Sequence, residues 1–154
     1  SYKNPIVKNN IRNNKFHFHT KSAKNLAATA DLFLKKYPSA IIIPVPSSNN
    51  RERKRGYKHL LNILQYSQYR NQVRIDILKK RVNTPQQSHV SKQVRLQQQT
   101  GSFQCEKIDL PKAIQTIILF DDVVTTESTM AAARNTIQTH LPTNIKLICF
   151  AIVH

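Results

Sequence analysis

Residues 116–129, T-I-I-L-F-D-D-V-V-T-T-E-S-T, decide the fold class expected for this 154-residue chain. Their apolar first half ends on two adjacent carboxylates, Asp121 and Asp122, and hydroxyl side chains follow. A short β-branched apolar run of this kind is typical of a buried parallel strand that leads into a loop and then a helix. Hydroxyls and the backbone N–H groups at the start of a helix can bind a phosphate. The stretch therefore predicts a sugar-phosphate site at the end of a parallel strand.

The polar residues of this stretch have a second interpretation, which stays open at this point. Asp, Thr and Ser after a strand often serve only as turn formers and helix caps. Carboxylate oxygens, however, suit sugar hydroxyls or a magnesium-bound ligand, and the hydroxyls that follow them suit a phosphate. The expected site residues are Asp121, Asp122, Val123, Thr125, Thr126, Glu127, Ser128 and Thr129, with Asp121 and Asp122 as the catalytic pair.

The rest of the chain alternates between helical and extended patterns. Apolar residues three and four apart predict helices, and short β-branched runs predict strands. The expected helices lie within residues 1–20 and over residues 20–38, 57–69 and 128–140, and the expected strands over residues 40–45, 73–78, 116–122 and 145–153, with the last strand buried. Thr20 or Ser22 can cap the second helix. The inward side chains are expected to be Ala23, Leu26, Ala27, Ala30, Phe33, Leu34 and Tyr37 in the second helix, Leu60, Leu61, Leu64 and Ser67 in the third, and Met130, Ala133 and Ile137 in the fourth. This alternation predicts one α/β domain over residues 1–154, with a mostly parallel sheet covered by helices on both faces.

A basic loop follows the strand expected at residues 40–45. Pro44 cannot donate to a β-ladder and should end that strand. Ligands of open α/β folds bind at the carboxyl ends of the strands. One guanidinium group can donate two parallel hydrogen bonds to phosphate oxygens. We therefore expect a pyrophosphate to contact Ser47, Arg51, Arg53, Lys54 and Arg55.

The formal net charge of +16 is concentrated in the middle third of the chain. Between Arg51 and Arg95, twelve basic residues stand against two acidic ones. A solvated basic surface is one explanation, but such an excess is more typical of proteins that bind nucleic acid, pyrophosphate or anionic lipid. The residues expected to contact nucleic acid are Arg53, Lys54, Arg55, Lys58, Arg81, Lys92 and Arg95.

Residues 79–103 are basic, rich in Gln and nearly without large apolar side chains. Such a segment cannot build a core of its own, so we expect a flexible flap over the site, with Phe103 anchoring its return. Cys105 and Cys149 form no C-x-x-C pair and no metal-ligand set is expected; Cys149 lies in an apolar run and should be a buried thiol. No apolar run approaches the ~20 residues that span a bilayer and no signal peptide begins at Ser1, so we expect a cytoplasmic protein.

Several groups of residues, taken together, resemble motifs of the ComF family of competence proteins. Residues 42–46 read I-I-P-V-P and residues 51–57 read R-E-R-K-R-G-Y, as at that family's strand end and arginine loop. The acidic pair and hydroxyls of residues 121–129 resemble the phosphoribosyl-pyrophosphate (PRPP) loop of type I phosphoribosyltransferases. The flap fits in part, through Arg81, Thr84, Gln87, Ser88, Arg95, Gly101 and Phe103. The resemblance covers essentially the whole chain but lacks the family's N-terminal zinc-binding cysteines.

The resemblance implies a type I phosphoribosyltransferase fold that binds magnesium PRPP and single-stranded DNA during natural transformation. The implied partners are a ComFA-type helicase and the membrane DNA-uptake channel, which would recruit the protein to the inner face of the membrane. Glu127 stands where the family pattern has Gly, and its carboxylate would repel a phosphate nearby. Turnover by this site is therefore an open question. The alternative function is a phosphoribosyltransferase of nucleobase salvage, or a regulator derived from one.

Overall fold

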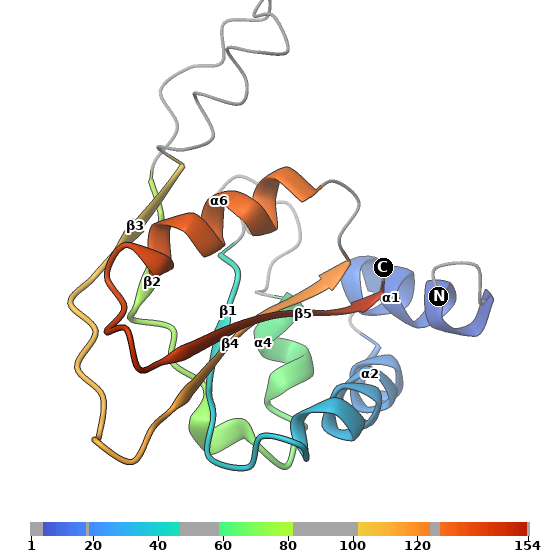
Figure 1. Cartoon of the computed structure of the whole chain (residues 1–154). Coiled ribbons are helices and arrows are strands. Elements are labelled where there is room, and N and C mark those ends of the chain that lie inside the picture. The colour runs from blue at the N-terminus through green and yellow to red at the C-terminus, as the bar shows by residue number, and fades with distance from the viewer. Residues whose placement is uncertain (1–4, 18, 47–58, 82–101, 124–126, 154) are drawn as a thin grey trace, which may run out of the picture.

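Three parallel strands form the central sheet of the computed structural model, which describes residues 5–17, 19–46, 59–81, 102–123 and 127–153. Their order is β1-β4-β5, so the acidic strand β4 lies in the middle (Figure 1). The strands are β1 (Ile41–Pro44), β4 (Thr116–Val123) and β5 (Lys146–Val153), beside a two-stranded antiparallel ladder of β2 (Leu78–Lys80) and β3 (Phe103–Cys105). The expected α/β class with a parallel sheet is confirmed.

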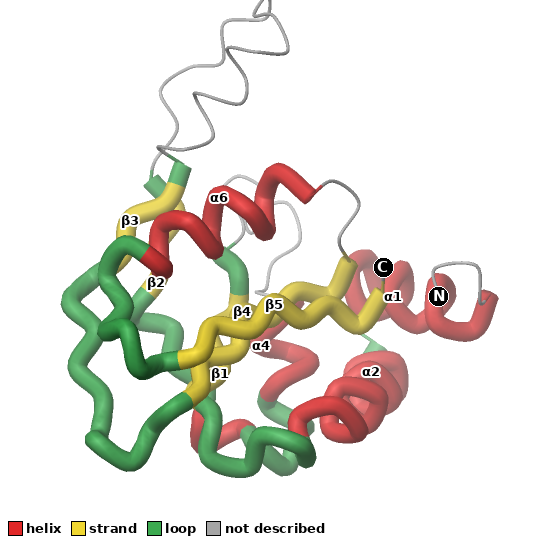
Figure 2. Tube along the Cα trace, viewed as in Figure 1, coloured by secondary structure: helices red, strands yellow, loops and turns green. Residues whose placement is uncertain are grey.

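Helices cover both faces of this sheet, as the sequence predicts (Figure 2). Among the described elements, one face carries three helices, and the other carries one helix and the β2–β3 ladder. The first three are α1 (Pro5–His17), α2 (Thr20–Leu34) and α4 (His59–Leu64), and the helix of the second face is α6 (Glu127–Gln138); η1 (Arg70–Gln72) is a short 3-10 turn. Side chains alternate along β4 because a strand has a period of two, so Ile118 and Phe120 pack on one face while Ile117 and Leu119 pack on the other.

Helix α2 packs through the small and apolar stripe that the sequence predicts. Ala23, Leu26, Ala27, Ala30 and Leu34 are all buried, and the alanines let the helix lie close to its neighbours. Neither Thr20 nor Ser22 caps the helix: the N-cap residue is His19, without a side-chain cap hydrogen bond, and Ser22 is buried within the helix.

The inward faces expected for the other two helices are confirmed for α6 and need one change in α4. Helix α6 packs through Met130, Ala133 and Ile137, as expected. In α4, Ile63 takes the buried position expected for Leu61, which is only half-buried.

The strand expected over residues 73–78 is wrong for most of its length. Val73 makes a single parallel bridge to Ile42, and the chain then bends, leaving Ile75 exposed. Arg74 and Asp76 pair across this bend, with Nε and Nη2 donating to the carboxylate over 2.8 and 2.7 Å. A local ion pair can hold residues 74–76 in a bend that an alternating pattern alone does not reveal.

Strand β5 is an edge strand and not the fully buried strand expected from its apolar sequence. It pairs only with β4 among the described strands, and most of its residues are half-buried. Cys149 is exposed on this edge, so the expectation of a buried core thiol is wrong. An apolar run predicts a strand but does not say how many neighbours the strand will have.

Candidate functional site

The candidate site lies at the carboxyl edge of β1 and β4. The two strands are parallel neighbours in which Pro44 pairs with Phe120, and the Val45 N–H donates to the Phe120 carbonyl over 2.9 Å. Pro44 ends β1, as predicted from its missing N–H. The chain therefore leaves both strands at adjacent points of one edge, which is where open α/β folds bind ligands.

The two acidic residues point to opposite faces of β4, because the strand continues through Val123. Asp121 follows the register of Ile117 and Leu119, and its side chain is partly exposed. Asp122 follows Ile118 and Phe120 and is only 2 % exposed. The Asp122 N–H donates to Asp121 Oδ1 over 2.8 Å, which fixes the first carboxylate close to the backbone. The two carboxylates therefore lie in different environments.

Asp122 faces a buried histidine that the sequence reasoning did not single out. His59 Nε2 lies 3.5 Å from Asp122 Oδ2, and both side chains are buried. This distance is longer than an ordinary hydrogen bond but short enough for strong attraction when the imidazole is protonated. His59 is the first residue of α4, so this helix brings the ring under the end of β4.

A buried asparagine of α1 holds the first turn of α4. Asn14 Nδ2 donates to the His59 carbonyl over 3.3 Å, and Asn14 Oδ1 accepts from Asn62 Nδ2 over 2.7 Å. Asn14 is 0 % exposed. The sequence carries a signal for it, because Asn14 follows Val7 and Ile11 on the inward face of α1, where a polar residue needs partners.

The structure describes only part of the predicted phosphate loop. Helix α6 begins at Glu127, so this residue has helical backbone, and Thr129 is half-buried in the first turn. Val123 is half-buried at the end of β4. Thr125 and Thr126 lie outside the described residues, as do Ser47, Arg51, Arg53, Lys54, Arg55, Lys58, Lys92 and Arg95.

The base of the predicted flap is a short ladder. Lys80 pairs with Phe103, and the Arg81 N–H donates to the Ser102 carbonyl over 2.9 Å. Phe103 is 3 % exposed and lies in the core, as expected of a residue that holds the chain there, whereas Arg81 is exposed. The flap itself, residues 82–101, lies outside the described residues.

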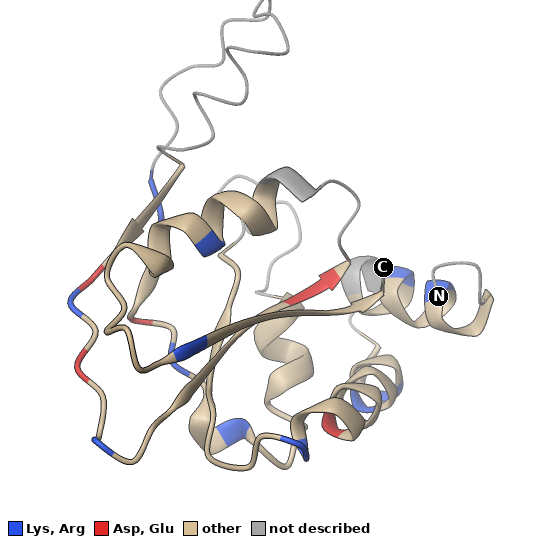
Figure 3. Ribbon diagram, in the orientation of Figure 1, with Lys and Arg blue, Asp and Glu red and all other residues tan. Residues whose placement is uncertain are grey.

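Acidic residues lie at the end of β4, and exposed basic residues lie along α1 and along α2, which also carries Asp31. Figure 3 shows acidic residues at the head of the β4 arrow and basic residues along α1 and α2. The exposed basic residues of these two helices include Lys8, Arg12, Lys21 and Lys24, none of which the sequence reasoning singled out.

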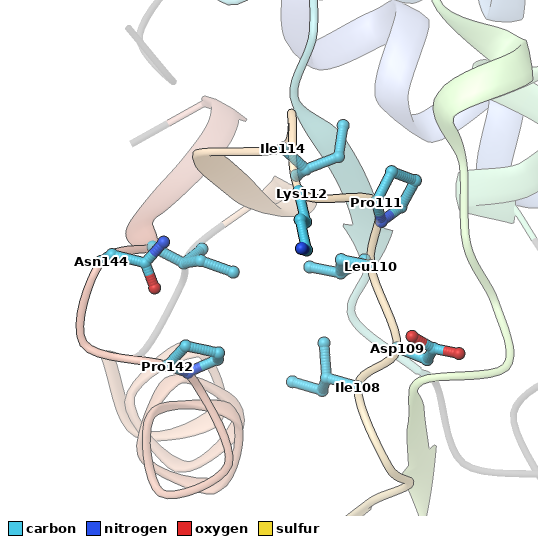
Figure 4. A pocket seen from close by; sticks show the side chains of 9 residues that line it. Ile108, Asp109, Leu110, Pro111, Lys112, Ile114, Pro142 and Asn144 are labelled. Atoms are coloured by element: carbon cyan, nitrogen blue, oxygen red, sulfur yellow. The ribbon is translucent and has the colours of Figure 1, made fainter.

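A cavity of about 220 Å³ opens at the other edge of the sheet (Figure 4). Its wall comes from the segments that precede β4 and β5, including Ile108, Leu110 and Ile145, with Asp109 and Asn144 among them. The amino ends of the strands meet there. The cavity is therefore separate from the carboxylates at the carboxyl edge.

Among the described residues, no three His, Cys, Asp or Glu side chains gather as a group that could hold a metal ion. Of the helices that the described residues form, none is both long and apolar enough to cross a membrane.

Comparison of the chain with protein-family models, with curated proteins and with solved structures found no match.

Proposed function

We propose that this chain is a type I phosphoribosyltransferase-like protein of the ComF kind, which binds PRPP or a ribose phosphate and single-stranded DNA during DNA uptake. One observation carries the proposal. Strands β1 and β4 share one carboxyl edge beside a partly exposed Asp121; in the sequence the arginines follow β1 and the hydroxyls follow β4. To hold one PRPP molecule, a pyrophosphate site and a ribose 5-phosphate site must lie at the same edge of the sheet.

In this proposal each segment meets the part of PRPP that its chemistry suits. The acidic end of β4 accepts from the ribose hydroxyls, and the hydroxyls before α6 donate to the 5-phosphate. Arg51, Arg53 and Arg55 bind the pyrophosphate, and Mg²⁺ enters with the ligand through ribose and pyrophosphate oxygens. Positive charge would develop at the ribose C1 as the pyrophosphate leaves, so electrostatic positioning would supply the catalysis.

Glu127 argues against efficient turnover at this site. It adds a carboxylate to the first turn of α6, where the 5-phosphate is proposed to bind. Negative charge suits a helix N-terminus by itself, but a carboxylate at this position would repel the phosphate that is proposed to bind there. We therefore propose that the protein binds its ligand with weak or lost turnover.

Calorimetric titration with PRPP tests the site. In low-phosphate buffer we expect binding that requires Mg²⁺, with a Kd in the roughly micromolar to millimolar range usual for substrates. The Glu127→Gly variant should bind more tightly, because it removes one negative charge from the phosphate site. Absence of binding in both proteins would overturn the sugar-phosphate assignment.

Single-stranded DNA is the proposed second ligand because of the charge balance. The described part of the chain adds the exposed basic residues of α1 and α2 to those expected in residues 51–95. Lys and Arg contacts to phosphates release counterions, so such binding weakens steeply as salt rises.

Salt titration of oligonucleotide binding checks this second ligand. Replacing Arg53, Lys54 and Arg55 together by Ala should lower the slope of log affinity against log salt by about 2, at roughly 0.7 for each lost contact. The matched control removes the same charge at the amino edge through Lys35, Lys36 and Lys112, which are exposed. Equal slopes for the wild type and the arginine variant would count against DNA binding through this loop.

The remaining parts of the proposal concern partners and location. A ComFA-type helicase and the membrane DNA-uptake channel are the proposed partners, with the protein in the cytoplasm at the inner face of the membrane. A salvage enzyme, the alternative function, would instead bind one purine or pyrimidine tightly together with PRPP.

A further inference from the structure

We propose that His59 is a positioning residue for Asp122, and that Asp121 alone of the two carboxylates contacts the ribose hydroxyls. This inference rests on the proposed function, because it divides the roles of the acidic pair within that site. It departs from the sequence-based expectation that both carboxylates contact the sugar.

Asp121 and Asp122 differ in how deeply their side chains are buried. Asp122 is 2 % exposed on the face that α1, α2 and α4 cover, while Asp121 is partly exposed on the opposite face. One ligand at the edge of the sheet cannot easily reach a carboxylate that is enclosed beneath a helix. Asp121 can be reached without any movement of the core.

The second step is the fixed position of His59. The ring lies at the start of α4 with Nε2 3.5 Å from Asp122 Oδ2. The His59 backbone is held in turn by Asn14, which is fully buried and also binds Asn62. A ring that is held through its own backbone can fix the position of the carboxylate that it faces.

The third step connects this cluster with the ligand edge. The Asp122 N–H donates to Asp121 Oδ1 over 2.8 Å, so the orientation of the peptide that carries Asp122 also sets the place of the Asp121 carboxylate. His59 would thus act on the ligand through Asp122 and the β4 backbone. Around bound metal ions, loss of a partner that orients a ligating side chain lowers affinity by about ten- to hundredfold, and we expect a loss at the lower end of that range for PRPP.

Replacing His59 by Gln or by Asn shows whether the imidazole positions Asp122 or only fills space in the core. Glutamine places an N–H group near the position of Nε2, whereas asparagine is one methylene shorter and does not reach it. We expect His59→Gln to keep PRPP affinity within about threefold of the wild type and His59→Asn to lose about tenfold. The double variant with Asp122→Asn should bind no more weakly than the weaker of its two single variants, because the residues act as one unit.

The outcomes distinguish this inference from the proposed function. If wild-type protein does not bind magnesium PRPP, the proposed function fails. The coupling of His59 and Asp122 is still measured by the midpoints of urea unfolding of the wild type, His59→Asn, Asp122→Asn and the double variant of these two. Additive shifts of those midpoints would overturn the pairing. Equal PRPP affinity of His59→Asn and the wild type would overturn the positioning role. A loss in Asp122→Asn as large as in Asp121→Asn, with His59→Asn unaffected, would place Asp122 on the ligand itself.

Discussion

Replacing Asp121 by Asn weakens the affinity for magnesium PRPP by about a hundredfold or more and leaves the folded domain intact. The partly exposed carboxylate is proposed to accept hydrogen bonds from two ribose hydroxyls, and hydrogen bonds to a charged group contribute about 1.5–3 kcal/mol each. Losing this amount corresponds to roughly two or more powers of ten in Kd. Calorimetric titration measures the loss, and thermal unfolding shows whether the fold is kept.

A matched variant makes this result specific. Asp109→Asn removes the same charge from an exposed position at the amino edge, beside the cavity of Figure 4. It should bind PRPP as the wild type does, because any general effect of net charge is the same in both variants. Equal losses in the two variants would mean that the ligand senses overall charge and not the β4 edge.

Phe120→Ala lowers the free energy of unfolding by about 3–5 kcal/mol, the usual cost of removing a buried aromatic ring. Phe120 is 0 % exposed, and its ring centroid lies 5.8 Å from that of Phe150. Phe150 stacks in turn on Phe33 of α2, with the centroids 4.1 Å apart. The ring thus connects β4, β5 and α2, and its loss leaves a cavity directly below the candidate site. Urea unfolding measures the effect.

The control for this variant is Leu32→Ala, on an exposed position of α2. Leu32 is 64 % exposed, so its truncation should change stability by less than about 0.5 kcal/mol. A loss below about 1 kcal/mol in Phe120→Ala would contradict the packing described for this face of the sheet.

Local periodicity predicts much of this fold. In α2 and in α6, apolar residues three and four apart fall on one face of the helix. Both helices bury the residues expected on that face. Pro44 marks the end of β1 for a chemical reason, the missing N–H. These features depend on residues close in sequence, which is why they can be predicted without the rest of the chain.

The errors arise where distant neighbours decide the outcome. Residues 73–78 alternate like a strand, yet only Val73 finds a partner in β1 and Ile75 remains exposed. Cys149 sits in an apolar run but is exposed, because β5 has β4 on one side and forms an edge. The alternating pattern of a strand indicates which side chains share a face of the sheet, but it does not indicate which elements cover that face.

In the candidate site, too, local features could be predicted and long-range contacts could not. The order of strand, acidic pair and hydroxyls locates a polar site at the end of β4, and strand alternation alone implies that Asp121 and Asp122 face opposite ways. The buried contact of Asp122 with His59 joins residues 63 positions apart, and Asn14 adds a third segment. No local pattern brings these three segments together.

A crystal structure of the protein with PRPP and Mg²⁺ tests the central claim most directly. The account predicts the ribose 5-phosphate at the start of α6, with the ribose hydroxyls within hydrogen-bond distance of Asp121 and the pyrophosphate against the segment that follows β1. PRPP bound in the cavity at the amino edge, or bound at the carboxyl edge without contact to Asp121, would contradict it.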